Sequence, residues 1–227
     1  MPEPLPNPEL LPSLGRLTRG LSALFWGLPT ALIVCFHTAK AEGLKAFGVV
    51  PPLASTGLLV YGLWQLGAFQ KQERVWRQAL DRAMVLGLVI CGLSPFLYWW
   101  NRMPSKPFFL AMVMLLTLAS LLFLSSLNVV LQRLGAMLPE EALRQEIKQF
   151  TPVNLNLLFT TLVLVVAYLV LMQLDKVPLW LGMVLAVMDR ASLWFLVLLV
   201  LLPLALTMAL LWKTKEVILD SVFGAGQ

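Results

Sequence analysis

Long apolar blocks alternate with short polar connections along the whole chain. One block, Phe108–Leu131, is long enough to cross a bilayer as a helix, because about 20 apolar residues span the hydrocarbon. Counting outward from this block predicts six transmembrane helices within residues 20–213, at about 21–37, 46–69, 83–100, 108–132, 153–174 and 192–212. The pattern therefore predicts an all-α membrane protein.

Two apolar segments do not fit this set of spans. Glu140–Phe150 has a helical apolar face and follows Pro139, so we expect a separate amphipathic cytosolic helix, with Glu140 paired to Arg144 one turn later. It should end before Thr151-Pro152, a typical helix start. Val177–Met188 would rise only about 18 Å as a helix, which predicts a short interfacial or re-entrant helix.

Both ends of the chain are predicted to be tails. Residues 1–19 begin with a proline-rich stretch, which predicts an extended cytosolic tail, and residues 214–227 form a second cytosolic tail. Ala39-Lys40-Ala41 resembles the cleavage site of a signal peptide. The long proline-rich segment before the first apolar block favours an uncleaved first span instead.

Charge sets the expected orientation. Only 13% of residues are charged and 59% are hydrophobic, whereas soluble domains carry about 25% charged residues. Lys and Arg number eleven on the side of the two termini and six on the other, which places both termini in the cytoplasm, at a plasma or inner membrane. The net charge of +5 is explained by this bias, so we expect the lipid bilayer and no nucleic acid as partner.

Two helices carry polar seams. On the fourth span, polar residues share an arc of about 140°: Thr117, Ser120, Ser125, Asn128 and Gln132. On the fifth, Asn154, Thr161 and Tyr168 recur every seven residues. Hydrocarbon offers amides no partner, so we expect the two seams to meet, either packed through hydrogen bonds or lining a path for a solute. The packed arrangement is favoured.

The connection between the second and third spans is the most basic. Its apolar residues recur at helical spacing, which predicts a helix continuous with the third span or lying at the headgroups. Anionic lipid is a possible ligand of its four cations, although the general topology signal also explains them: Lys71, Arg74, Arg77 and Arg82.

The sequence offers little for catalysis. No charged residue lies in the middle of a predicted span, His37 is the single histidine, and the motifs of zinc proteases, serine hydrolases and nucleotide-binding loops are missing. Cys35 and Cys91 read as small apolar residues, so no metal or cofactor is expected.

Three functions stay open from the sequence. The leading interpretation is a non-catalytic scaffold or accessory subunit with a membrane-protein partner or a second copy of itself. The alternative is a passive carrier or channel for a small neutral or amphipathic solute, although Leu179–Val184 lacks the residues of a selectivity filter. A lipid-processing membrane enzyme is the third.

Overall fold

The computed structural model describes residues 10–40, 45–69, 73–138, 140–171, 183 and 197–223, and within these ranges it is all-helical. The elements are α1 (Leu10–Lys40), the 3₁₀ turn η1 (Lys45–Phe47), α2 (Val50–Leu66), α3 (Arg74–Leu93), α4 (Phe96–Arg102), α5 (Pro107–Met137), α6 (Glu141–Leu171), the π-helical turn η2 (Val197–Leu201) and α9 (Leu202–Phe223). The predicted fold class is confirmed at this level.

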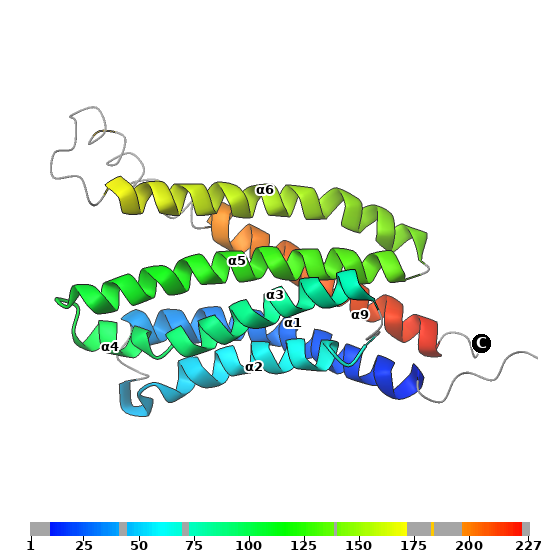
Figure 1. Ribbon diagram of the computed structural model, residues 1–227, viewed down its shortest axis with the longest axis horizontal. Coiled ribbons are helices and arrows are strands. Elements are labelled where there is room, and N and C mark those ends of the chain that lie inside the picture. The colour runs from blue at the N-terminus through cyan, green and yellow to red at the C-terminus, as the bar shows by residue number, and fades with distance from the viewer. Residues whose placement is uncertain are drawn as a thin grey trace, which may run out of the picture.

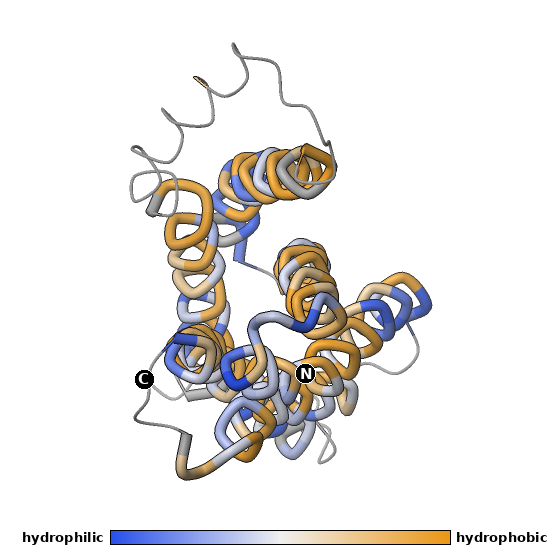
Figure 2. The backbone as a smooth tube through the Cα atoms, turned by 90° about the vertical axis from the view of Figure 1, so that its left-hand side faces the viewer, coloured by the Kyte–Doolittle hydropathy of each residue, from blue (hydrophilic) through white to orange (hydrophobic). Residues whose placement is uncertain are grey.

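The long helices run back and forth along one axis (Figure 1). Each contacts the next in the order α1, α2, α3, α5, α6, α9, and α9 returns to α1. The start of α1 and the end of α9 lie at the same end of the bundle (Figure 1). Viewed nearly along the helices, most of the tube is hydrophobic (Figure 2), as expected of a bundle with a bilayer as solvent.

Five described helices are long and apolar enough to cross a membrane: Pro12–Lys40, Arg74–Arg102, Pro107–Met137, Arg144–Ala167 and Leu198–Asp220. They coincide with five of the six predicted spans. α2, at the predicted second span, has 17 residues and a rise of about 26 Å, a little short of roughly 30 Å of hydrocarbon. Val177–Met188 lies outside the described residues except for Met183.

The first helix begins earlier than the sequence indicated. α1 starts at Leu10, so the second half of the predicted tail is helical, and Met1–Glu9 lies outside the described residues. Pro12 falls in the first turn of α1, where a missing N–H costs no helical hydrogen bond. Leu17 is fully buried, so this added turn packs into the bundle.

The basic connection and the third span form one rod, as one of the two sequence interpretations expected. α3 begins at Arg74 and continues, after the break at Ser94-Pro95, into α4. Asn101 on α4 donates a hydrogen bond to the Thr38 carbonyl of α1, at 2.9 Å. The far end of this rod is therefore fixed to the far end of α1.

The amphipathic segment is not a separate helix, which corrects the prediction. α6 runs through Thr151-Pro152 without a break. Pro152 leaves the Lys148 carbonyl without its helical donor, but Lys148 is on the exposed side, where water can replace that bond.

The predicted pair of Glu140 and Arg144 is also wrong. The Arg144 guanidinium instead donates to the carbonyl oxygens of Ala136 (3.5 Å) and Leu138 (3.3 Å). These carbonyls belong to the end of α5, where a helix leaves acceptors unpaired and favours a cation. Arg144 thereby ties the start of α6 to the end of α5.

Two glycines let α1 and α2 pack with their backbones in contact. A Cβ atom on Gly20 would lie 2.8 Å from the Gly62 carbonyl oxygen, and one on Gly62 would lie 2.8 Å from Leu24 Cγ. The close approach is made by single glycines on two different helices, neither of which carries a GxxxG pattern. Gly57, on the same helix as Gly62, faces open space.

Candidate functional site

The predicted meeting of two polar seams occurs at one level of the bundle, where α5, α6 and α9 converge. Asn128 of α5, Asn154 of α6 and Thr207 of α9 are all fully buried. The Asn154 amide donates to Asn128 Oδ1 at 2.9 Å, which joins the fourth and fifth predicted spans directly. We call these three residues the amide triad.

The amide triad is closed through hydrogen bonds of ordinary length. Asn128 Nδ2 donates to Thr207 Oγ1 at 2.9 Å and to the Leu124 carbonyl at 2.8 Å, and Asn154 Nδ2 donates to Thr207 Oγ1 at 3.0 Å. The Thr207 hydroxyl donates to the Pro203 carbonyl at 2.8 Å. All four amide hydrogens and both acceptor positions of the hydroxyl are therefore used.

A second polar link joins α6 to α9 two turns away from the triad. The Thr161 hydroxyl lies 2.8 Å from the Leu157 carbonyl of its own helix and 3.0 Å from the Leu199 carbonyl of η2. Leu199 is four residues before Pro203, which has no N–H to offer that carbonyl. Thr161 therefore supplies a donor at the point where proline removes one.

Only part of the predicted stripe on α5 faces protein, which corrects the expectation for the rest. Thr117 and Ser120 are exposed, and their hydroxyls donate to carbonyls of their own helix, as does that of Ser125. Such bonds satisfy a hydroxyl without any neighbouring helix. Gln132 is half-buried and makes no hydrogen bond, and the Tyr168 side chain lies outside the described residues.

Two buried oxygens, one in the amide triad and one beside it, have no hydrogen-bond donor among the described residues. Asn154 Oδ1 and Thr151 Oγ1 are both on α6, one turn apart, and both residues are fully buried. These acceptors leave each residue with spare hydrogen-bonding capacity, at a cost of about 1–3 kcal/mol for a buried unpaired group. No group of three or more His, Cys, Asp or Glu that could hold a metal occurs within the described ranges.

Thr207 is the member of the triad that sequence reasoning missed. It lies four residues after Pro203 in the apolar first half of α9, and Thr214 follows seven residues later, also fully buried. A seven-residue repeat of polar residues is the signal that marked Asn154 and Thr161, so the same rule would have found it.

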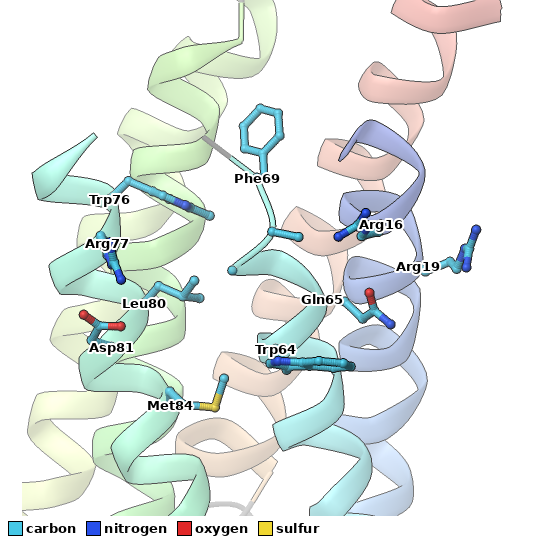
Figure 3. A pocket seen from close by; sticks show the side chains of 12 residues that line it. Arg16, Arg19, Trp64, Gln65, Phe69, Trp76, Arg77, Leu80, Asp81 and Met84 are labelled. Atoms are coloured by element: carbon cyan, nitrogen blue, oxygen red, sulfur yellow. The ribbon is translucent and has the colours of Figure 1, made fainter. Parts of the chain in front are cut away.

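The basic connection contributes to a separate cavity of about 710 Å³ among α1, α2 and α3 (Figure 3). Arg77 lines this cavity. Arg16 and Arg19 of α1 line it too, although in the sequence they counted only among the cations that set the membrane orientation. Arg74 and Arg82 are exposed on α3 but do not line it, and Lys71 lies outside the described residues.

The geometry therefore offers one buried polar cluster and one basic cavity. Amides and hydroxyls have no group that exchanges a proton near neutral pH, so the triad can hold helices together but has no acid or base for catalysis. Comparison with protein-family models, with curated proteins and with solved structures finds no match to this chain.

Proposed function

We propose that this multi-pass membrane protein crosses the bilayer six times, with α2 as the second span in addition to the five longer helices, and with both termini in the cytoplasm. An even number of crossings agrees with α1 beginning and α9 ending at the same end of the bundle (Figure 1). The excess of Lys and Arg at that end supports a cytoplasmic placement. The turn after α2 lengthens this short helix, because the amides of Ala68 and Phe69 donate to the Gln65 and Leu66 carbonyls at 3.3 and 3.1 Å.

We further propose that the protein is a non-catalytic scaffold or accessory subunit of a membrane complex. The observation that carries this proposal is the closed amide triad. Asn128, Asn154 and Thr207 are fully buried, and all their side-chain donors are paired with one another or with backbone carbonyls. A carrier would need some of these groups free to replace the hydration of a passing solute.

Native gel electrophoresis after mild solubilisation tests the subunit. We expect the protein to migrate with a partner, or with further copies of itself, as one discrete complex of fixed stoichiometry. Migration as a single protomer in every mild detergent would contradict the proposal.

A flux measurement tests the alternative function of a passive carrier. Liposomes that contain the purified protein should be no more permeable to glycerol-sized neutral solutes than empty liposomes. Flux that disappears in Asn128→Leu would overturn the scaffold and favour the carrier, because that residue would then line the path.

Cysteine labelling tests the orientation. In a background without Cys35 and Cys91, cysteines at the exposed positions Gln78 and Gln149 should resist an impermeant thiol reagent in intact cells, and a cysteine at Ser105 should react. Labelling of Gln78 together with protection of Ser105 would invert the orientation.

A further inference from the structure

The basic cavity among α1, α2 and α3 is amphipathic along its depth. Arg16 and Arg77 lie near one end of it, on opposite sides, whereas Trp64 and Met84 lie further along the helices (Figure 3). Trp64 is 67% exposed on α2, so with α2 as a span, as proposed above, the apolar part of the cavity opens toward lipid. The arginines mark the level where headgroups meet water.

The charges of the cavity are unpaired. The guanidinium groups of Arg16, Arg19 and Arg77 make no ion pair or hydrogen bond with any residue that the structure describes. Asp81, one turn after Arg77 on α3, also lines the cavity and offsets one of the three positive charges. The remaining positive charge is available to an anion, and guanidinium groups bind phosphate oxygens particularly well.

The wall of the cavity contains a buried donor without an acceptor. Trp76 is only 1% exposed, lines the cavity, and its indole Nε1 has no hydrogen-bond partner. Its ring extends from α3 toward the segment that carries Phe69, opposite Arg16 (Figure 3). A buried indole N–H usually finds a partner, because leaving it unpaired costs about 1–3 kcal/mol. An acceptor oxygen from outside the chain would remove this cost.

We propose that this cavity binds the phosphate headgroup of an anionic phospholipid. Arg16 and Arg77 hold the phosphate from two sides, the Trp76 N–H donates to one of its oxygens, and the acyl chains leave along Trp64 and Met84. The shared chemistry is a phosphate anion, which a lipid or free phosphate could supply. The apolar half of the cavity favours the lipid, because free phosphate has nothing to place there.

Thermal unfolding of the delipidated full-length protein in detergent tests the site. Phosphatidylglycerol should raise the unfolding temperature in a saturable way, whereas phosphatidylcholine and inorganic phosphate should not. Arg16→Gln with Arg77→Gln should weaken the apparent affinity for phosphatidylglycerol by about tenfold or more, since each lost charge-assisted contact is worth about 1.5–3 kcal/mol.

The matched control is Arg74→Gln with Arg82→Gln. It removes two positive charges, the same number, from the first half of α3, but neither residue lines the cavity, so the affinity should fall less than about twofold. Equal losses in the two double variants would overturn the proposal and leave only a general attraction of basic residues to an anionic surface. An equal shift from inorganic phosphate would overturn the assignment to a lipid.

Trp76→Phe separates binding from folding. Phenylalanine keeps an aromatic ring but lacks both the N–H and the second ring of the indole. The lipid-free protein should therefore lose some stability, and the shift caused by phosphatidylglycerol should also become smaller. A Trp76→Phe variant that loses stability without lipid and keeps the full lipid-induced shift would show that the indole has a structural role only, and would remove it from the site.

Discussion

The two halves of the bundle hold their helices together in different ways. α1 and α2 pack closely because Gly20 and Gly62 have no side chains, so the two backbones can touch. In contrast, α5, α6 and α9 are joined by the side-chain hydrogen bonds of Asn128, Asn154 and Thr207. Both solutions suit a bilayer, in which apolar side chains gain little by leaving lipid for protein.

This difference decides how each half tolerates change. A side chain added at Gly20 meets a backbone carbonyl that cannot rotate away, so the whole helix must move. A side chain removed from the amide triad leaves its partners some freedom to find other bonds, as interhelical hydrogen bonds in membranes average only about 0.6 kcal/mol. The glycine contact should therefore be the more sensitive of the two.

The largest effect is expected at the glycine contact. Gly20→Leu should lower the free energy of unfolding in detergent by about 1–3 kcal/mol, the usual cost of overpacking, or prevent folding. Gly57→Leu is the matched control, because a Cβ there meets nothing within 4 Å. Equal stability of both variants, measured by denaturant titration, would mean that α1 and α2 do not pack this closely.

The next effect is expected in the amide triad. Asn128→Leu should lower the free energy of unfolding by about 0.5–2 kcal/mol, since Asn154 and Thr207 each lose a bonded partner. Ser125→Val, on the same helix, should change little because its hydroxyl bonds only its own helix. Additive losses for Asn128→Leu and Asn154→Leu in a double-mutant cycle would contradict a direct contact.

A smaller effect is expected at the proline of the last helix. Thr161→Val should cost about 0.6 kcal/mol, because the Leu199 carbonyl loses a donor while the volume of the side chain is kept. Thr117→Val is the control, since that hydroxyl is exposed and bonds only Val113. If both variants lose the same stability, the bond between α6 and η2 contributes nothing of its own.

The smallest effect is expected at the pair of Lys213 and Glu146, which joins α9 to α6 at the end of the bundle. Both side chains are more than a third exposed, so Lys213→Ala should cost at most about 1 kcal/mol, and less as salt is added. A loss that is large and independent of salt would place this pair among the main contacts of the second half.

The hydrogen-bonded half was the easier one to predict. Asn128 and Asn154 stand out in apolar helices, and an amide at membrane depth must find a partner. The sequence could not show which face of α5 is buried, because apolar residues occupy every face of that helix and the hydroxyl of Thr117 needs no neighbour. The helix break at Pro152 was predicted from local preference, which the packing of α6 against α5 and α9 overrides.

The glycine half and the basic cavity were harder to predict. Gly20 and Gly62 lie 42 positions apart on two helices, so no local motif joins them. In the sequence, Arg16 and Arg77 are two separate charges at the ends of apolar blocks. Only the packing of α1 and α3 against α2 brings them to one cavity. Pairings between distant segments are what a single sequence leaves open.

The amide triad can be completed only late in the synthesis of this protein. Helices leave the ribosome from the N-terminus, so Asn128 and Asn154 enter the membrane while Thr207 is still to be synthesised. Until α9 arrives, the two amides have each other and the Leu124 carbonyl, with two of their four hydrogens unused. We expect a chain that stops before Thr207 to retain an unfinished polar surface in the membrane, by which the quality-control machinery of the cell can distinguish it from the complete protein.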